Sequence, residues 1–300
     1  MQNTKFNIIG SGAIGHLWYC YLQKQQCQVQ LIARRPIDAK TIRVDSPNVK
    51  FSSLVKYQTL EQSHDLDSII ICVKAHQLET LCQSLVNKVT KGSPFILMMN
   101  GLGLVEIVNR YFPDSPTIHA SITHGAYLHE NTLYHTGNGV TELGNLQTSY
   151  SKQSFAPIVG MLNAALPEVV WNEHHRETMH LKLIVNAIIN PVTALNGIKN
   201  GLIVENNNLI SEADRLLNEL KPLLPTLLPN HSIKQIQQHI ISIAQQTSSN
   251  ISSMQQDVLN NRETEIDFIN GYLLTLAKTS SLELSHHSQI ISRIKALKQI

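Results

Sequence analysis

The chain has 300 residues, of which 42% are hydrophobic and 15% are charged, and its net charge is +2 at pH 7. This composition suits one or two hydrophobic cores and excludes a disordered chain or a strongly basic nucleic-acid-binding domain. No apolar run approaches the roughly 18 residues that cross a membrane, and we expect no signal peptide. The cysteines form no Cys-x-x-Cys pair, so we expect buried free thiols in a reducing cytoplasm, at Cys20, Cys27, Cys72 and Cys82.

The N-terminal region predicts a strand, a glycine turn and a helix. Residues 10–15 read GSGAIG, with the glycines in G-x-G-x-x-G spacing. Between a strand and a helix, this spacing permits a tight turn, the approach of a pyrophosphate and close helix–strand packing. The phosphates are expected at the helix N-terminus, where backbone N–H groups favour an anion. We therefore expect cofactor contacts from the whole turn: Gly10, Ser11, Gly12, Ala13, Ile14 and Gly15.

A second strand is predicted over residues 28–34 and ends at Arg34. An enzyme that uses NAD usually has an acidic residue about 20 residues after the glycines, which binds the ribose 2′-hydroxyl. A guanidinium can instead bind the 2′-phosphate of NADP. The sequence therefore favours NADP(H), although Arg34 and Arg35 can also be plain solvated charges and Asp38 is an acid close by.

Strands over residues 67–74 and 94–101, with a helix over 76–89, continue a doubly wound, mostly parallel sheet. Lys74 ends the first of these strands, and Asn100 lies at the end of the second. Because ligands bind outside the carboxyl ends of parallel strands, we expect both side chains near the cofactor. Residues 41–58 and 117–145 alternate more loosely, and we expect them to extend the same sheet with antiparallel strands.

The pattern becomes almost entirely helical near residues 172–175, which predicts a Rossmann domain over 1–173 and an all-α domain over 174–300. Lys182, Asn186 and Asn190 recur every four residues and so form one stripe along an otherwise apolar helix. Burying such a stripe is costly, so it is a candidate for binding a polar substrate. Alternatively, the amides bridge helices and the lysine reaches solvent. Pro191 is expected to end or kink this helix.

Motifs along the chain resemble those of the 2-dehydropantoate 2-reductase (ketopantoate reductase) family, from Phe6 to about Ala277. They are GSGAIG, VKAHQ, MNGLG, THGAYL, KLIVNAIINPVTAL, NGIKNG and NISSMQQDV…RETEIDFINGYLL. The resemblance implies a Rossmann domain followed by a helical domain. It also implies NADPH-dependent reduction of a small 2-oxo acid, 2-dehydropantoate, to (R)-pantoate, in the pathway to pantothenate and coenzyme A. The enzyme would be a monomer or a homodimer, with no nucleic acid or membrane partner.

The resemblance also implies roles for individual residues. Lys182 matches the proton donor and a substrate contact. The remaining substrate-binding positions match Asn100, Asn186, Asn190, Asn200 and Ser253, and further cofactor contacts match Arg34, Lys74, Asn100, Ala126 and Glu265. Taken without the family, Ser252 or Ser253 could simply cap a helix, and Glu265 could be a surface charge.

Two other functions remain open from the sequence. One is reduction of another small 2-oxo acid, and the other is a non-catalytic NADP(H)-binding regulator. We expect no metal site, because a spacing of five residues spreads histidines around a helix or across a strand. This applies to His119, His124 and His129, and the cluster of His174, His175 and His180 makes no natural three-ligand set. The sequence assigns no role to Arg35, His124 or that cluster.

Overall fold

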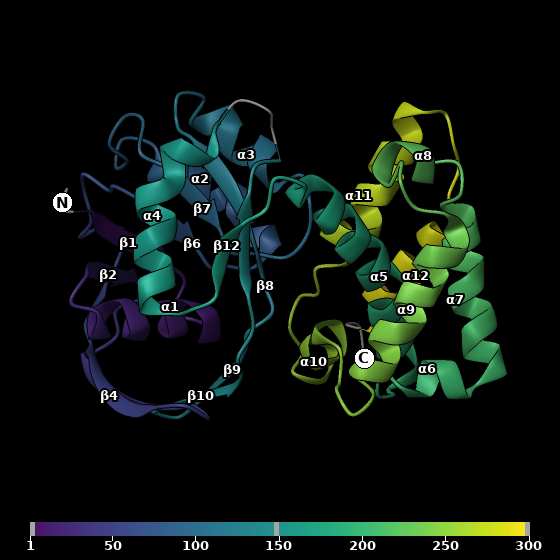
Figure 1. Cartoon of the computed structure of the whole chain (residues 1–300), viewed down its shortest axis with the longest axis horizontal. Helices are drawn as coiled ribbons and strands as arrows, with labels where there is room; N and C mark the ends of the chain where they lie inside the picture. Colours follow the sequence, from purple (N-terminus) through teal and green to yellow (C-terminus); the bar gives the residue numbers. More distant parts are fainter. Residues whose placement is uncertain (1–3, 147–149, 298–300) are drawn as a thin grey trace. The chain divides into compact units, whose positions relative to one another are not determined.

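A computed structural model of the chain describes residues 4–146 and 150–297, and the chain divides into two compact units. Unit 1 consists of Met1–Asn100 and Leu104–Arg176. Unit 2 consists of Gly101–Gly103 and Glu177–Ile300. The strands drawn in Figure 1 belong to unit 1, and the described part of unit 2 is helical. The predicted α/β Rossmann region followed by an all-α region is therefore confirmed.

The main sheet of unit 1 has eight strands in the order β12-β11-β8-β7-β6-β1-β2-β5. Its centre is parallel, because β1 pairs with β2 and β6, and β6 pairs with β7. The strands are β1 (Lys5–Ile9), β2 (Gln28–Ile32), β5 (Tyr57–Gln58), β6 (Ile69–Ile71), β7 (Phe95–Leu97), β8 (Thr117–Ile122), β11 (Thr141–Gly144) and β12 (Val169–Trp171). Strands β6 and β7 are apolar and buried along their whole length, as parallel strands under helices require.

Helices connect these strands and cover the sheet. Among them, α1 buries Leu17, Trp18 and Leu22 completely in the core of unit 1. The helical segments of unit 1 are α1 (Ala13–Lys24), η1 (Ala75–Gln77), α2 (Leu78–Leu85), α3 (Leu104–Tyr111) and α4 (Lys152–Ala165). The helix predicted over 76–89 is thus a 3-10 turn followed by a shorter α-helix.

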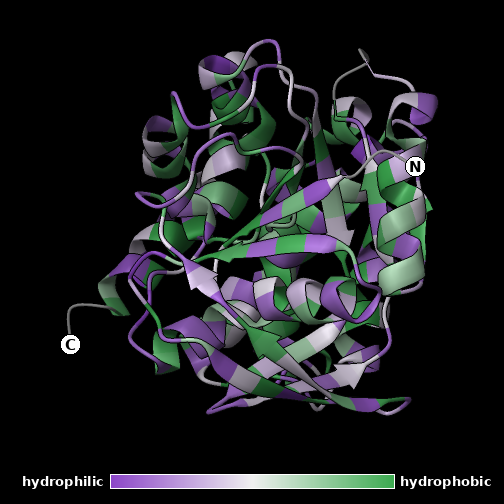
Figure 2. Cartoon of the chain, turned by 90° about the vertical axis from the view of Figure 1, so that its left-hand side faces the viewer, coloured by the Kyte–Doolittle hydropathy of each residue, from purple (hydrophilic) through white to green (hydrophobic). Residues whose placement is uncertain are grey.

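Four of the loosely alternating strands form a second sheet, so the prediction that they extend the main sheet is wrong for them. Its order is β4-β3-β10-β9, with β3 (Lys40–Asp45), β4 (Lys50–Val55), β9 (Gly125–His129) and β10 (Thr132–Gly137). Only one face of β3 is buried, through Ile42 and Val44, and it packs with the residues of α1. Figure 2 shows this alternation along the strands at the bottom of the view. In the main sheet, β5 pairs in parallel with β2, β8 pairs in parallel with β7, and β11 pairs antiparallel with β8.

Unit 2 is built around the long helix α5 (His175–Asn196). Of the two effects expected of Pro191, an end or a kink, the helix does not show the first: it continues past Pro191 and stops before Gly197, whose φ of +62° is the left-handed conformation that terminates helices. The other helices are α6 (Leu202–Glu205), α7 (Asn207–Glu219), α8 (Leu224–Leu227), α9 (Ile233–Gln246), α10 (Ser253–Leu259), α11 (Ile266–Thr279) and α12 (Ser285–Ala296).

Among the described residues, α5 is the one helix long and apolar enough to cross a membrane by length and composition. Of its most apolar 18-residue window, 72% is buried inside the protein. A core helix passes the same test, so this helix is weak evidence for a membrane span.

Substitution of Gly15 tests the packing of α1 on β1. A Cβ at Gly15 would overlap the carbonyl oxygen of Gly10, whereas a Cβ at Gly12 would meet no protein atom within 4 Å. We expect Gly15→Ala to lower the free energy of unfolding by about 1–3 kcal/mol, because backbone must shift to make room. Gly12→Ala is the control and should cost less than about 1 kcal/mol. Urea unfolding measures both, and equal stabilities would contradict the inferred packing.

Candidate active site

The glycine turn joins β1 to α1 at the carboxyl end of the sheet. Gly10 has φ +118°, and a Cβ there would lie 2.7 Å from the carbonyl oxygen of Cys72. Gly12 is the N-cap of α1, and no side chain caps the first turn of this helix. Because a side chain at Gly12 would meet no protein atom, the space beside the helix N-terminus is open. Open space at the second glycine fits a pyrophosphate that approaches the backbone closely.

His16 supports this turn from within α1. It is 2% exposed, its Nδ1 lies 2.9 Å from the Gly12 carbonyl oxygen, and its Nε2 lies 2.8 Å from the Tyr57 hydroxyl. The carbonyl only accepts, so Nδ1 donates to it and Nε2 accepts from Tyr57. Burial lowers the pKa of His16, which agrees with a neutral ring. This role of His16 is not predictable from the sequence, because a histidine one residue after the glycine motif carries no signal by itself.

Three predicted cofactor residues follow neighbouring parallel strands. Arg34 lies two residues after β2, Lys74 three residues after β6, and Asn100 three residues after β7. Strands β2, β1, β6 and β7 are adjacent and parallel, so their carboxyl ends lie at one edge of the sheet together with the glycine turn. Arg34 is exposed, while Lys74 and Asn100 are half-buried. No salt bridge joins Arg34 to Asp38 in the described part of the chain.

Ala126 lies on β9 of the second sheet, opposite His135 on β10. His124 precedes this strand, and its Nδ1 lies 3.2 Å from Nε2 of His135. The other ring nitrogen of His135, Nδ1, lies 3.1 Å from the Tyr21 hydroxyl. Burial and the neighbouring His135 lower the pKa of His124 to about 4. His124 is therefore neutral near pH 7 and serves as a hydrogen-bonding member of the unit 1 core.

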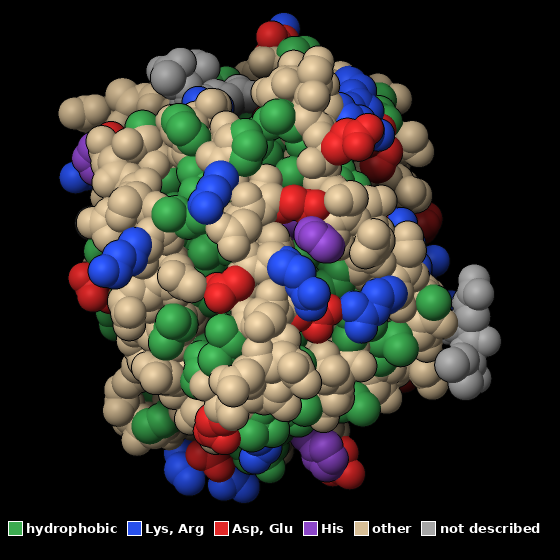
Figure 3. All heavy atoms as spheres, turned by 90° about the vertical axis from the view of Figure 1, so that its right-hand side faces the viewer, with side chains coloured by type: hydrophobic (Ala, Val, Ile, Leu, Met, Phe, Trp, Pro, Cys, Tyr) green, Lys and Arg blue, Asp and Glu red, His purple; other side chains and the backbone are tan. Residues whose placement is uncertain are grey.

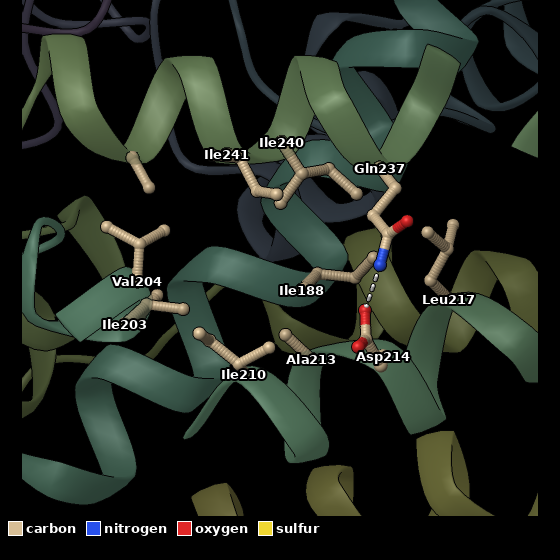
Figure 4. A pocket seen from close by; sticks show the side chains of 11 residues that line it. Ile188, Ile203, Val204, Ile210, Ala213, Asp214, Leu217, Gln237, Ile240 and Ile241 are labelled. Carbon is tan, nitrogen blue, oxygen red and sulfur yellow. Dashed lines mark hydrogen bonds between the residues drawn. The ribbon is translucent and has the colours of Figure 1, made fainter. Parts of the chain in front are cut away.

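In unit 2, the polar stripe of α5 lies on the side of the helix that is least buried. Between residues 179 and 194, every residue is buried except Leu181, Lys182 and Asn186, which are half-buried. Asn190 is 8% exposed. Ile188 lies about 200° around the helix from both amides. Figure 4 shows it pointing toward a pocket formed with residues of α6, α7 and α9, where Gln237 donates to Asp214 at 2.7 Å.

The predicted residues after α5 also lie in unit 2. Asn200 is 8% exposed, and its Nδ2 donates to the Thr247 hydroxyl at 3.0 Å. Ser253 is the exposed first residue of α10. Glu265 is the N-cap of α11 and is 6% exposed. It is therefore not the surface charge that its sequence neighbourhood allows.

Ser252, next to Ser253, has a different environment. It is 5% exposed, and its Oγ accepts the backbone N–H of Gln255 at 3.2 Å as the N-cap of α10. Its Oγ also lies 2.8 Å from the hydroxyl of Thr193 on α5. Ser252 thus ties α10 to α5, and Ser253 is left accessible.

Comparison with known proteins identifies the family. The model of ketopantoate reductase PanE/ApbA matches residues 6–148, and the model of its C-terminal region matches residues 174–299. A 2-dehydropantoate 2-reductase of Vibrio cholerae is 31% identical over 296 residues, which cover 97% of each chain. The chain belongs to the ketopantoate reductase family. A member from Archaeoglobus fulgidus is 25% identical over 99% of each chain.

Solved structures show the same fold. A probable 2-dehydropantoate 2-reductase of Bacillus subtilis has a TM-score of 0.82 and 26% identity, and the match covers 98% of this chain and 99% of that one. D-mandelate dehydrogenase, solved with NADH and anilino(oxo)acetate, has a TM-score of 0.88 at 19% identity over 99% of each chain. The fold of the ketopantoate reductases thus also occurs in a dehydrogenase of low sequence identity.

The clustered histidines have separate partners. Nε2 of His175 lies 3.2 Å from Nδ1 of His119, whose Nε2 donates to the carbonyl of Met99 at 3.0 Å. His180 contacts the carbonyl of Leu227 through Nδ1 at 2.9 Å. In the described residues, no group of three or more His, Cys, Asp or Glu side chains could hold a metal ion.

The cysteines are all free, but their burial differs. Cys20 and Cys82 are buried as predicted, whereas Cys27 and Cys72 are half-buried. Burial raises the pKa of the Cys20 thiol to about 11, so this thiol is protonated and unreactive near neutral pH.

Replacement of the two adjacent serines separates their roles. We expect Ser252→Ala to lower the free energy of unfolding by about 1–2 kcal/mol, because it removes an N-cap and the contact with Thr193. Ser253→Ala should change it by less than about 0.5 kcal/mol, because that side chain is exposed. The two urea unfolding curves provide the comparison. Equal destabilisation by both would mean that the assignment of the cap is wrong.

Proposed function

We propose that this protein reduces 2-dehydropantoate to (R)-pantoate with NADPH, as a step toward pantothenate and coenzyme A. The observation that carries this proposal is the stripe on α5, where Lys182 and Asn186 lie on the one incompletely buried side of a core helix. Membership of the ketopantoate reductase family adds independent support. A polar stripe on such a helix is useful to an enzyme that binds and protonates a small polar substrate.

The residues of unit 1 suit NADPH. The open space beside Gly12 accommodates a pyrophosphate at the N-terminus of α1. Arg34 is exposed and is not paired with Asp38, so its guanidinium is available for a 2′-phosphate. Lys74 and Asn100, at the same edge of the sheet, would contact the cofactor, as would Ala126. Glu265 matches a further cofactor contact of the family.

The proposed chemistry assigns one task to each residue of unit 2. NADPH, when bound, supplies the hydride that reduces the ketone carbon. Lys182 donates a proton to the ketone oxygen as negative charge develops there. Asn186 and Asn190 hold the substrate with its ketone oxygen toward that ammonium. Asn200 and Ser253 bind the carboxylate and hydroxyl groups of the substrate, and Asn100 matches a further substrate-binding position of the family.

Two alternatives use the same residues differently. The enzyme could reduce another small 2-oxo acid on the same scaffold, and a regulator could bind NADP(H) without turnover. A regulator has no need of a lysine and two amides on α5, so the stripe favours an enzyme. Oxidation of NADPH with a panel of 2-oxo acids distinguishes the three functions: fastest turnover of 2-dehydropantoate supports the proposal, and no turnover with any acid favours the regulator.

We further propose that the enzyme is cytoplasmic and acts as a monomer or a homodimer. The four cysteines form no disulfide, as is usual in a reducing compartment. A ketopantoate reductase of Staphylococcus aureus with the same fold is described as dimeric. Cations and anions are mixed on the face of unit 2 drawn in Figure 3, and a net charge of +2 produces no long-range basic field that would attract nucleic acid.

Substitution of Arg34 tests the choice of cofactor. Arg34→Ala should weaken NADPH binding by roughly 10- to 100-fold, because one charge-assisted contact with the 2′-phosphate is lost. NADH lacks this phosphate, so its affinity should change little. Fluorescence titration measures both affinities, with Arg35→Ala as the matched control. If the unaltered protein binds NADH as tightly as NADPH, the assignment of Arg34 is wrong.

Substitution of Lys182 tests the proton donor. Lys182→Ala should lower kcat by roughly 10²–10⁴-fold, which is the usual contribution of a general acid. The affinity for NADPH should hardly change, since Lys182 lies in unit 2 and the glycine turn lies in unit 1. Lys234→Ala, an exposed lysine on α9, is the control. A Lys182→Ala variant with nearly unchanged kcat would show that the proton comes from another group.

A further inference from the structure

Helix α5 contains a carbonyl group that its own backbone cannot satisfy. Pro191 lies inside the helix and has no N–H, so the carbonyl of Ala187, four residues earlier, lacks its helical partner. The side chain of Asn270 on α11 takes that place, with Nδ2 donating to the Ala187 carbonyl oxygen at 2.9 Å. Both residues are fully buried. Asn270 therefore supplies a bond that solvent does not replace.

The other N–H of Asn270 points to His287 on α12, whose Nδ1 lies 3.0 Å away. The carbonyl of Ala187 only accepts, which fixes the amide with its nitrogen toward it. Nε2 of His287 lies 3.1 Å from the carbonyl of Leu216, which also only accepts. The ring therefore carries its proton on Nε2 and accepts from Asn270 at Nδ1. This single arrangement satisfies all three contacts, and it requires a neutral His287.

Helix α7 holds the histidine from the other side. Leu216 lies in the last turn of α7, where carbonyls lack helical partners. Glu219 at the end of α7 accepts the backbone N–H groups of His286 and His287 at 2.8 and 3.1 Å. The titratable groups around the ring are thus Glu219 from α7 and His286 from α12, while α11 contributes the neutral Asn270. Burial lowers the pKa of His287, although Glu219 opposes the shift.

Ala187 lies directly after Asn186 and within one turn of Asn190, on the helix that carries the proposed substrate contacts. We infer that Asn270 and His287 are positioning residues: by holding the Ala187 carbonyl, they fix the turn of α5 that presents Asn186 and Asn190 to the substrate. This inference rests on the proposed function for the identity of the reaction. The hydrogen bonds themselves are independent of it.

The contact between Asn270 and Nδ1 of His287 depends on pH, because it requires a neutral ring. Protonation places a hydrogen on Nδ1 of His287 opposite the amide hydrogens of Asn270, so this contact is lost. The folded-state pKa lies below the ordinary value of 6.5, so the unfolded chain binds more protons in this window. The free energy of unfolding therefore falls as pH drops from 6.5 through the lowered pKa. The activity that depends on this contact falls over the same range.

Two variants separate positioning from bulk packing. Asn270→Leu leaves the Ala187 carbonyl without a partner and should lower kcat/KM roughly 10- to 100-fold, by misplacing the substrate contacts. The affinity for NADPH should stay within about threefold, and amide hydrogen exchange in α5 should accelerate. His287→Asn places its amide oxygen at the position of Nδ1 and can still accept from Asn270, although it is too short to reach the carbonyl of Leu216. The His287→Asn variant should keep kcat/KM at neutral pH within about threefold of the wild type. Its kcat/KM should fall less than that of the wild type as the pH drops below 6.5, because the titrating ring is gone.

Asn196→Ala is the matched control. Asn196 also donates from Nδ2 to a carbonyl of α5, that of Val192 at 2.8 Å, but it is exposed at the helix end. The Asn196→Ala variant should have the same kcat/KM and the same amide hydrogen exchange in α5 as the wild type. The inference is wrong if Asn270→Leu has the same kcat/KM and the same amide hydrogen exchange in α5 as the wild type. It is also wrong if kcat/KM of His287→Asn falls as much as that of the wild type between about pH 8 and about pH 5. If the wild type prefers another 2-oxo acid, the proposed function fails, and the same comparison is made with that acid.

Discussion

The contact between Gly15 and the carbonyl of Gly10 determines where the N-terminus of α1 lies relative to the carboxyl edge of the sheet in unit 1. No side chain fits between the start of α1 and the end of β1, so the helix crosses the strand at van der Waals contact with its backbone. This fixes the helix N-terminus directly at the edge of the sheet. The carboxyl ends of β2, β6 and β7 are then in register with it through parallel pairing. The positions of Arg34, Lys74 and Asn100 depend on that register.

In unit 2, the helix α5 forms the centre of the core and also carries the polar side chains of the stripe. Most of its surface is packed against apolar side chains, including Ile188 among residues of α6, α7 and α9. The polar side chains lie on the remaining, less buried side of the helix. The backbone carbonyls next to them are held by hydrogen bonds from side chains. Asn270 holds one carbonyl, and the Thr193 hydroxyl contacts two others and Ser252. Rigidity of this kind suits a site that must orient a small molecule.

The sequence predicts those features that depend on local spacing. The glycine motif identifies the turn because its requirements lie within six residues, and a step of four residues places Lys182, Asn186 and Asn190 on one side of a helix. It fails where the deciding partner is distant. Helix α5 continues past Pro191, and the carbonyl of Ala187 that Pro191 leaves without a helical partner accepts from Asn270, 83 positions after Ala187 in the sequence. The loose alternation over residues 41–58 indicates strands, but it does not reveal that β3 and β4 belong to a second sheet that packs on α1 instead of extending the main sheet.

The tie between Ala187 and Asn270 also bears on how the chain acquires its structure during synthesis. Helix α5 is complete once Asn196 has been made, yet the partner of its buried carbonyl belongs to α11, and the ring that orients this partner belongs to α12. Nearly the whole of unit 2 must be translated before the middle of α5 is satisfied. Local helices can form early, but contacts of this sequence separation form late. The nascent helical unit is therefore incomplete at its centre until α11 and α12 have been translated, when α5 becomes the axis around which the other helices pack.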